Sequence, residues 1–180
     1  MKLSLKSCHS WRAWRAVLAA LALLLAALPL SASPTAEDHA WIAAVHYFQD
    51  ASGPTLWSLA EGKFAAFIEK YSNSEHYADA VVYEARAMYE QRKYDAVIAL
   101  LSAQPERAGA AADQFAYWTA KAWSQKKNYE KAAEVFARLI RENPNSSLRL
   151  EAIYREAEAH AILQYWPRVI EELGETNGIF

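Results

Sequence analysis

The chain has 180 residues, 53% of them hydrophobic, and a formal net charge of −2, which favours one folded domain behind a targeting segment. Its five Gly and six Pro are too few for a turn-rich all-β protein. The first 33 residues hold four basic and no acidic residues, so the remainder has 15 basic against 21 acidic residues, a net charge of −6. This sign disfavours a nucleic acid as partner, because phosphates need a clustered basic surface.

Residues 1–33 have the pattern of a secretory signal peptide. A basic N-terminus precedes a 13-residue apolar run, Ala16–Leu28, and small residues follow it. The run is shorter than the roughly 20 residues that span a bilayer, so an uncleaved membrane anchor is the weaker alternative. The basic start and the length look bacterial, and we expect export to the periplasm with cleavage near Ala32 and no stable membrane insertion afterwards. Cys8, the only cysteine, precedes the apolar run instead of following it, so we expect no lipid anchor and a mature chain without disulfides.

Helical patterns occupy most of the remaining chain, after a polar linker over residues 34–40. Apolar residues recur at intervals of three and four, as on helices that are buried along one side. Helices are expected over residues 41–50, 55–71, 77–91, 94–103, 148–163 and 167–173. The stretch Asp113–Ser147 holds two more helices around a short polar break, and the second helix ends before Pro144, which cannot continue a helix. Residues 174–180 form a tail. The fold class expected is all-α.

The second helix of each predicted pair repeats one pattern. An aromatic residue stands near its start, at Trp57, Tyr94, Tyr129 and Trp166, with intervals of 37, 35 and 37 residues. A small or β-branched residue follows three positions later, and a large apolar residue follows four positions after that. Repeats of this size built from helix pairs are typical of helical solenoids. The spacing therefore predicts a right-handed α-solenoid of about three and a half helix pairs, with these aromatic residues, Tyr47, Tyr71 and Trp118 interpreted as packing residues.

The repeat resembles the tetratricopeptide repeat (TPR) family over roughly Trp41–Leu173. The best copy has family signature residues at Ala120, Trp123, Tyr129, Ala132, Phe136, Leu139 and Pro144. The phrases FIEKYSNS and LIRENPNS resemble bacterial envelope members, among them the lipoprotein of outer-membrane β-barrel assembly and periplasmic proteins that coordinate envelope division. The missing lipoprotein cysteine counts against the first of these. The resemblance implies a protein-interaction role and is not specific for one partner.

Motifs that carry catalytic or cofactor chemistry are missing from the sequence. The five histidines form neither an HExxH motif nor a pair at four-residue spacing, and there is no CxxC, GxGxxG, P-loop or GxSxG. We therefore expect no enzyme active site, no cofactor and no metal site.

In the family that this chain resembles, the first helix of each pair lines a concave groove. Carried onto this sequence, the groove positions are Asp79, Val82, Arg86 and Tyr89, then Gln114, Tyr117, Lys121 and Ser124, then Glu151, Tyr154, Glu158 and Ala161. The candidates for peptide contact are Arg86, Tyr89, Gln114, Tyr117, Lys121, Tyr154 and Glu158, because tyrosine beside a cation suits peptide recognition. An ordinary solvated face of mixed charge is an equal alternative. The chaperone-type carboxylate clamp is not matched, since Tyr117 and Lys121 stand where that clamp needs Lys and Asn.

The function expected is a non-catalytic, exported scaffold that binds a protein or peptide partner. Two alternatives stay open. The chain could be the N-terminal part of a larger protein with further repeats or an enzyme beyond Phe180, because no polar capping helix follows Leu173. It could also form envelope complexes through its convex face, or a homodimer through its uncapped C-terminal end.

Overall fold

The computed structural model of the chain describes residues 34–174. These residues form eight α-helices and two short 3-10 turns, with no strand among them, so the expected all-α class is confirmed. The predicted signal peptide, residues 1–33, and the tail after Gly174 lie outside the described residues. Within the described range, no helix has the length and hydropathy needed to cross a membrane.

The helices match the expected ones closely, with one exception at the N-terminal end. They are α2 (Ala36–Gln49), α3 (Pro54–Lys70), α4 (Tyr77–Glu90), α5 (Tyr94–Ser102), α6 (Ala112–Gln125), α7 (Tyr129–Glu142), α8 (Arg149–Ile162) and α9 (Trp166–Gly174), with η1 (Pro105–Arg107) and η2 (Gly109–Ala111) between α5 and α6. The exception is α2, which begins inside the predicted linker 34–40. Glu37 and Asp38 lie in its first turn, where negative charge interacts favourably with the helix dipole.

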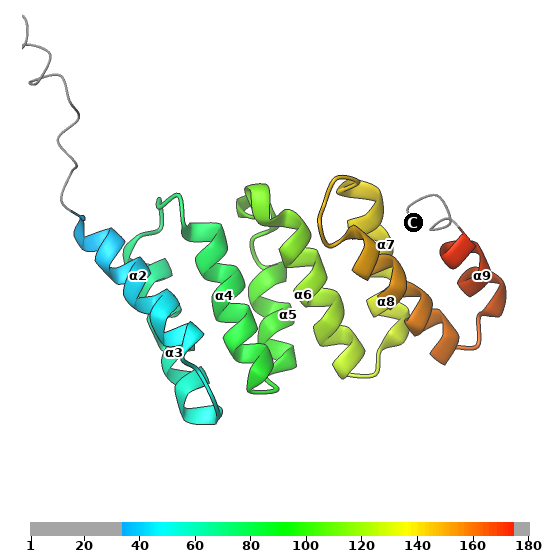
Figure 1. The fold of residues 1–180 in the computed structure, drawn as a ribbon, viewed down its shortest axis with the longest axis horizontal. Coiled ribbons are helices and arrows are strands. Elements are labelled where there is room, and N and C mark those ends of the chain that lie inside the picture. The colour runs from blue at the N-terminus through cyan, green and yellow to red at the C-terminus, as the bar shows by residue number, and fades with distance from the viewer. Residues whose placement is uncertain (1–33, 175–180) are drawn as a thin grey trace, which may run out of the picture. The chain divides into compact units, whose positions relative to one another are not determined.

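Each helix packs against the helix before it and the helix after it in the chain. The contacts run from α2 and α3 through to α8 and α9, and α4 also contacts α6. Figure 1 shows the helices side by side in chain order. Packing of each unit on its near neighbours is the property that defines a solenoid, so the α-solenoid expected from the repeat is confirmed.

The turn inside each of the last three helix pairs has one geometry. Arg92, Lys127 and Gln164 have φ of 62°, 60° and 62°, in the left-handed region, and they stand 35 and 37 residues apart. The residue after each donates its N–H to a carbonyl five positions back; Asn128, for example, donates to Trp123 over 3.0 Å. This bonding is the Schellman pattern that closes helix C-termini. The backbone therefore repeats at the same period as the aromatic residues.

The signature positions of the pair α6 and α7 form one of three buried clusters in the array. Ala120, Ala132, Phe136 and Leu139 are all fully buried in one cluster, where alanine lets two helices approach closely. The last helix differs, because α9 contains no buried residue. Trp166 is 57% exposed, so among the described residues it does not act as the packing wedge that its repeat position predicts.

Candidate functional site

Two cations, one on α4 and one on α6, lie over the indole ring of Trp118. Helices α4 and α6 are the first helices of two successive pairs. Arg86 of α4 lies 5.3 Å from the ring centre of Trp118 on α6 and 4.9 Å from that of Phe48 on α2. Lys121, one turn after Trp118, lies 4.4 Å from the same indole and 5.1 Å from the ring of Tyr89. Contacts of this kind contribute about 0.5–1 kcal/mol each at exposed sites. They hold both cations in defined positions between α4 and α6.

Tyr117 connects α6 to α8. Its side chain is buried, with 5% of the residue exposed, and its hydroxyl donates to Oε1 of Glu151 over 2.5 Å. Burial, followed by this bond to a carboxylate, raises the pKa of the Tyr117 phenol. The ring therefore has no free face for a ligand, and the residue holds Glu151 in place.

Arg155 completes this connection along α8. Its guanidinium lies 3.5 Å from Glu151 and 3.0 Å from Glu158. The bond to Glu158 raises the pKa of Arg155. Because both carboxylates hold the guanidinium, its position is set by α8 and needs no ligand to order it.

Lys121 is half-buried, and burial lowers the pKa of its ammonium while the negative charge of Glu151 opposes that shift. A partly desolvated cation attracts a carboxylate more strongly than one in bulk water, since the local dielectric constant is lower. Lys121 is therefore the group in this region best suited to bind a negative charge.

The ends of α4, α6 and α8 and the start of α7 surround an open hollow of about 410 Å³, here called the cationic hollow. Its lining consists of Tyr89, Lys121, Ser124, Gln125, Lys127, Tyr129, Phe136, Arg155, Glu158, Ala159 and Ile162. Three of these side chains are cationic and one is a carboxylate. The lining thus has two more cations than carboxylates although the chain as a whole is negative, and Glu151, which pairs with Arg155, reduces this excess.

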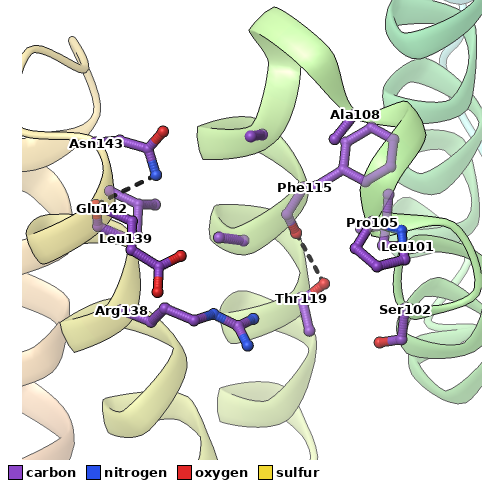
Figure 2. Close-up of a pocket in the computed structure, with 12 residues that line it drawn as sticks. Leu101, Ser102, Pro105, Ala108, Phe115, Thr119, Arg138, Leu139, Glu142 and Asn143 are labelled. Carbon is purple, nitrogen blue, oxygen red and sulfur yellow. Dashed lines mark hydrogen bonds between the residues drawn. The ribbon is translucent and has the colours of Figure 1, made fainter.

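A second hollow, of about 490 Å³, lies between α5, α6 and α7 (Figure 2). Its lining consists of Leu101, Ser102, Pro105, Ala108, Ala112, Phe115, Ala116, Thr119, Arg138, Leu139, Glu142 and Asn143. Helix α5 ends at Ser102, just before Pro105, and leaves this space beside α6. The α6 residues of the two hollows lie on opposite faces of the helix, because their positions differ by about half a turn. In this second hollow the single cation, Arg138, is balanced by Glu142.

The predicted groove residues are only partly brought together. Tyr89, Lys121 and Glu158 line the cationic hollow, and Arg86 stands beside it over Trp118. Tyr154 is exposed, with its ring 5.8 Å from Arg155. Gln114 lies in the first turn of α6, outside the cationic hollow, where its N–H donates to Asp113.

Sequence reasoning missed Trp118, Lys127 and Arg155 as parts of this region. Trp118 and Arg155 each follow a predicted groove position by one residue, so a wider helical face would have included them. Lys127 lies in the left-handed turn, and a turn position belongs to no helical face.

The family comparison agrees with the repeat described above. A family model described as "Tetratricopeptide repeat" matches residues 114–146. The chain contains a tetratricopeptide repeat unit. The match covers most of α6 and all of α7, which together form the pair with the best signature. A search of curated proteins finds no match. TPR units commonly mediate protein–protein interaction, which supports a scaffold role with a protein partner.

Proposed function

We propose that this TPR protein is a non-catalytic scaffold that holds an acidic segment of its partner in the cationic hollow. The observation that carries the proposal is the charge of that hollow, with Lys121, Lys127 and Arg155 against the single carboxylate of Glu158. A partner segment rich in Asp or Glu complements this charge. A basic segment would meet like charges, which act against binding.

The cationic hollow is organised before a ligand arrives. Lys121 lies over Trp118 and Tyr89, and Arg155 is held by two carboxylates of its own helix. Fixed cations lose little side-chain entropy on binding, which favours affinity. The exposed Ile162 at the rim offers an apolar contact beside the charges. The ligand expected is therefore an acidic peptide with an apolar residue next to its carboxylates.

Fluorescence polarisation with labelled peptides tests this proposal. Acidic peptides with one Leu or Phe are compared with versions whose Asp and Glu are replaced by Asn and Gln. The acidic set is expected to bind, and Lys121→Ala is expected to weaken binding about tenfold, which corresponds to about 1.4 kcal/mol. Raising the salt concentration is expected to weaken binding as well, because the hollow is open to solvent.

Arg138→Ala is the matched control, since Arg138 is an exposed cation in the second hollow. It is expected to leave the affinity unchanged. Equal binding of acidic and neutral peptides, or equal losses in the two variants, would show that the cationic hollow is not the binding site.

We also propose that the chain is exported to the bacterial cell envelope. The support is the N-terminal sequence pattern, a basic start followed by the apolar run Ala16–Leu28. A fusion of residues 1–40 to a reporter that is active only outside the cytoplasm tests it. An inactive fusion, or one that stays in the cytoplasmic fraction, would contradict the proposal.

Self-association through α9 is a second candidate. Trp166, Ile170 and Leu173 recur at helical spacing on α9 and are 57%, 73% and 43% exposed, and contiguous exposed apolar residues mark interaction surfaces. Sedimentation equilibrium of the protein and of Ile170→Lys distinguishes the cases. A dimer that is lost in the variant is the result expected, and a monomeric wild-type protein contradicts it.

A further inference from the structure

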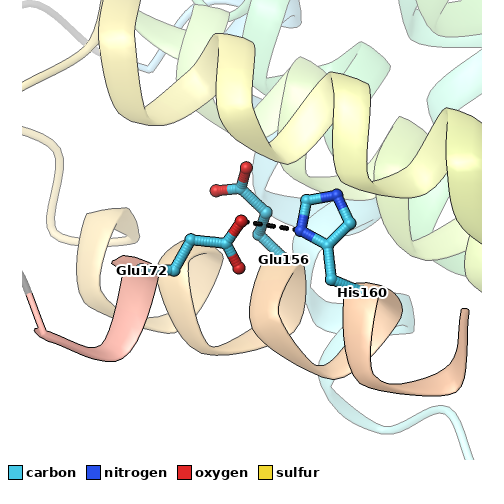
Figure 3. Close-up of side chains that lie close together, drawn as sticks. All are labelled: Glu156, His160 and Glu172. Atoms are coloured by element: carbon cyan, nitrogen blue, oxygen red, sulfur yellow. Dashed lines mark hydrogen bonds and ion pairs between the residues drawn. The ribbon is translucent and has the colours of Figure 1, made fainter. Parts of the chain in front are cut away.

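A histidine and two glutamates meet where the last two helices pack together. Glu156 and His160 stand one turn apart on α8, and Glu172 reaches them from α9. Figure 3 shows the two carboxylates and the imidazole directed toward one another. Each residue offers a donor atom, and all three donor atoms lie within 4.8 Å of one another. The side chains of His160 and Glu172 are only 17% and 13% exposed.

The separation of these donor atoms suits a small divalent ion. Two ligands of a tetrahedral zinc ion lie about 3.3 Å apart, because each bond is roughly 2.0–2.1 Å long. The closest pair, Nδ1 of His160 and Oε1 of Glu172, lies at 2.6 Å. A shift of less than about 1 Å would convert their hydrogen bond into two metal ligands. Side-chain rotation alone can supply such a shift.

One donor in this group has no hydrogen-bond partner among residues 34–174. Oε2 of Glu172 is buried and makes no hydrogen bond. A buried carboxylate oxygen without a partner is costly, since it has lost its water. A cation bound by Glu172 would compensate that loss. A simple His160–Glu172 ion pair leaves this oxygen unsatisfied.

We propose that Glu156, His160 and Glu172 form a binding site for one divalent transition-metal ion of the zinc class. One imidazole and two carboxylates are borderline and hard donors, which suit Zn²⁺. Their two negative charges balance the charge of the ion. Three protein ligands leave a coordination position for water or for a group from a partner. His160 binds through Nδ1, so its proton stays on Nε2.

The site would fasten α9 to α8. Helix α9 contains no buried residue, and its described contacts are chiefly with α8. A metal ion held by both helices adds a link that apolar packing does not provide. Ion binding to the folded chain alone also stabilises it by mass action. The metal is therefore expected to act on the order of α9.

Isothermal titration of the untagged full chain with Zn²⁺ tests the proposal, in a Cys8→Ser background that removes the only thiol. One ion is expected to bind per chain. Both His160→Ala and Glu172→Gln are expected to weaken binding at least tenfold. Co²⁺ added to the wild-type protein is expected to give visible d–d absorption bands, and Zn²⁺ is expected to abolish them by displacing it.

The matched control is His46→Ala on α2. His46 lies 2.9 Å from Asp50, its neighbour one turn later, so it repeats the His–carboxylate pair, with no third ligand in the part of the chain that the structure describes. This variant is expected to bind Zn²⁺ as the wild type does. Far-UV circular dichroism checks the folding of each variant. Glu156→Gln changes a ligand on α8 and is also expected to weaken Zn²⁺ binding, so it tests the site even if α9 frays in the other variants. No Zn²⁺ binding by the wild type, or undiminished binding by His160→Ala and Glu156→Gln, overturns the proposal.

Discussion

Glu84 is a carboxyl group inside the array, with 7% of the residue exposed. Burial, and secondarily the negative charge of Glu61, raises its pKa from 4.5 to about 7. The folded protein therefore holds this proton more tightly than the unfolded chain does. The contribution of the protonated Glu84 carboxyl to the stability of the fold is therefore complete below pH 4.5 and is lost as the pH rises through about 7.

The change Glu84→Gln keeps the shape of the side chain and removes its ionisation. As the pH rises from 5 to 8, the free energy of unfolding of the wild type is expected to fall by about 2 kcal/mol relative to that of the variant. Urea denaturation at a series of pH values measures this. Glu90→Gln, an exposed carboxylate on the same helix, is the control and is expected to follow the wild type. A pH dependence unchanged by Glu84→Gln would contradict the assignment.

At this same scale, spacing predicts which helical face a residue occupies and does not predict its exposure. Tyr117 and Lys121 are one turn apart on α6, and both contact Trp118. Tyr117 is nonetheless buried, because Glu151 of the next first helix covers its hydroxyl. That contact joins residues 34 positions apart. Whether such positions are covered depends on how neighbouring pairs are stacked, which a single helix period does not contain.

The left-handed turns are the element that repeats most closely, and none of them uses glycine. Arg92, Lys127 and Gln164 each have φ near +60°, a conformation that costs a residue with a Cβ roughly 1 kcal/mol. Arg92→Gly is expected to raise the free energy of unfolding by up to about 1 kcal/mol, since glycine adopts this region freely. Arg92→Val is expected to lower it, because β-branched residues fit this conformation worst. Denaturant unfolding of both variants checks the prediction. Changes in the free energy of unfolding that have the same sign in the two variants would refute it.

The types of the elements and most of their boundaries could be predicted from the periodicity and from Pro144, because buried helical faces are long and regular. The proposed metal ligands could not be predicted from the sequence. Glu156 and His160 are four residues apart, but Glu172 lies on another helix, twelve positions after His160. The turn through Gln164 brings α9 back onto α8. A search for pairs of histidines at helical spacing cannot find a site whose third ligand depends on that turn.

Across the described array, stability depends on contacts between neighbouring helices, so it differs between α7 and α9. In a solenoid each unit is stabilised by its neighbours, and among the described residues α7 packs on α6 and α8 whereas α9 packs chiefly on α8. The described residues fit this principle. Phe136 and Leu139 of α7 are fully buried between adjacent helices, whereas α9 has no buried residue.

Native-state hydrogen exchange should therefore be graded along the chain. Amides of α7 are expected to exchange only through extensive unfolding, and amides of α9 through local opening at a much lower free energy. The change Glu172→Gln weakens the contact of Glu172 with His160, so it is expected to speed exchange in α9 further and leave α7 unaffected. Arg168→Gln, which removes the exposed pair with Glu171 on the same helix, is the control and should change little. Equal protection of α7 and α9 would mean that the array unfolds as one unit, contrary to a fold in which each helix is held by its neighbours.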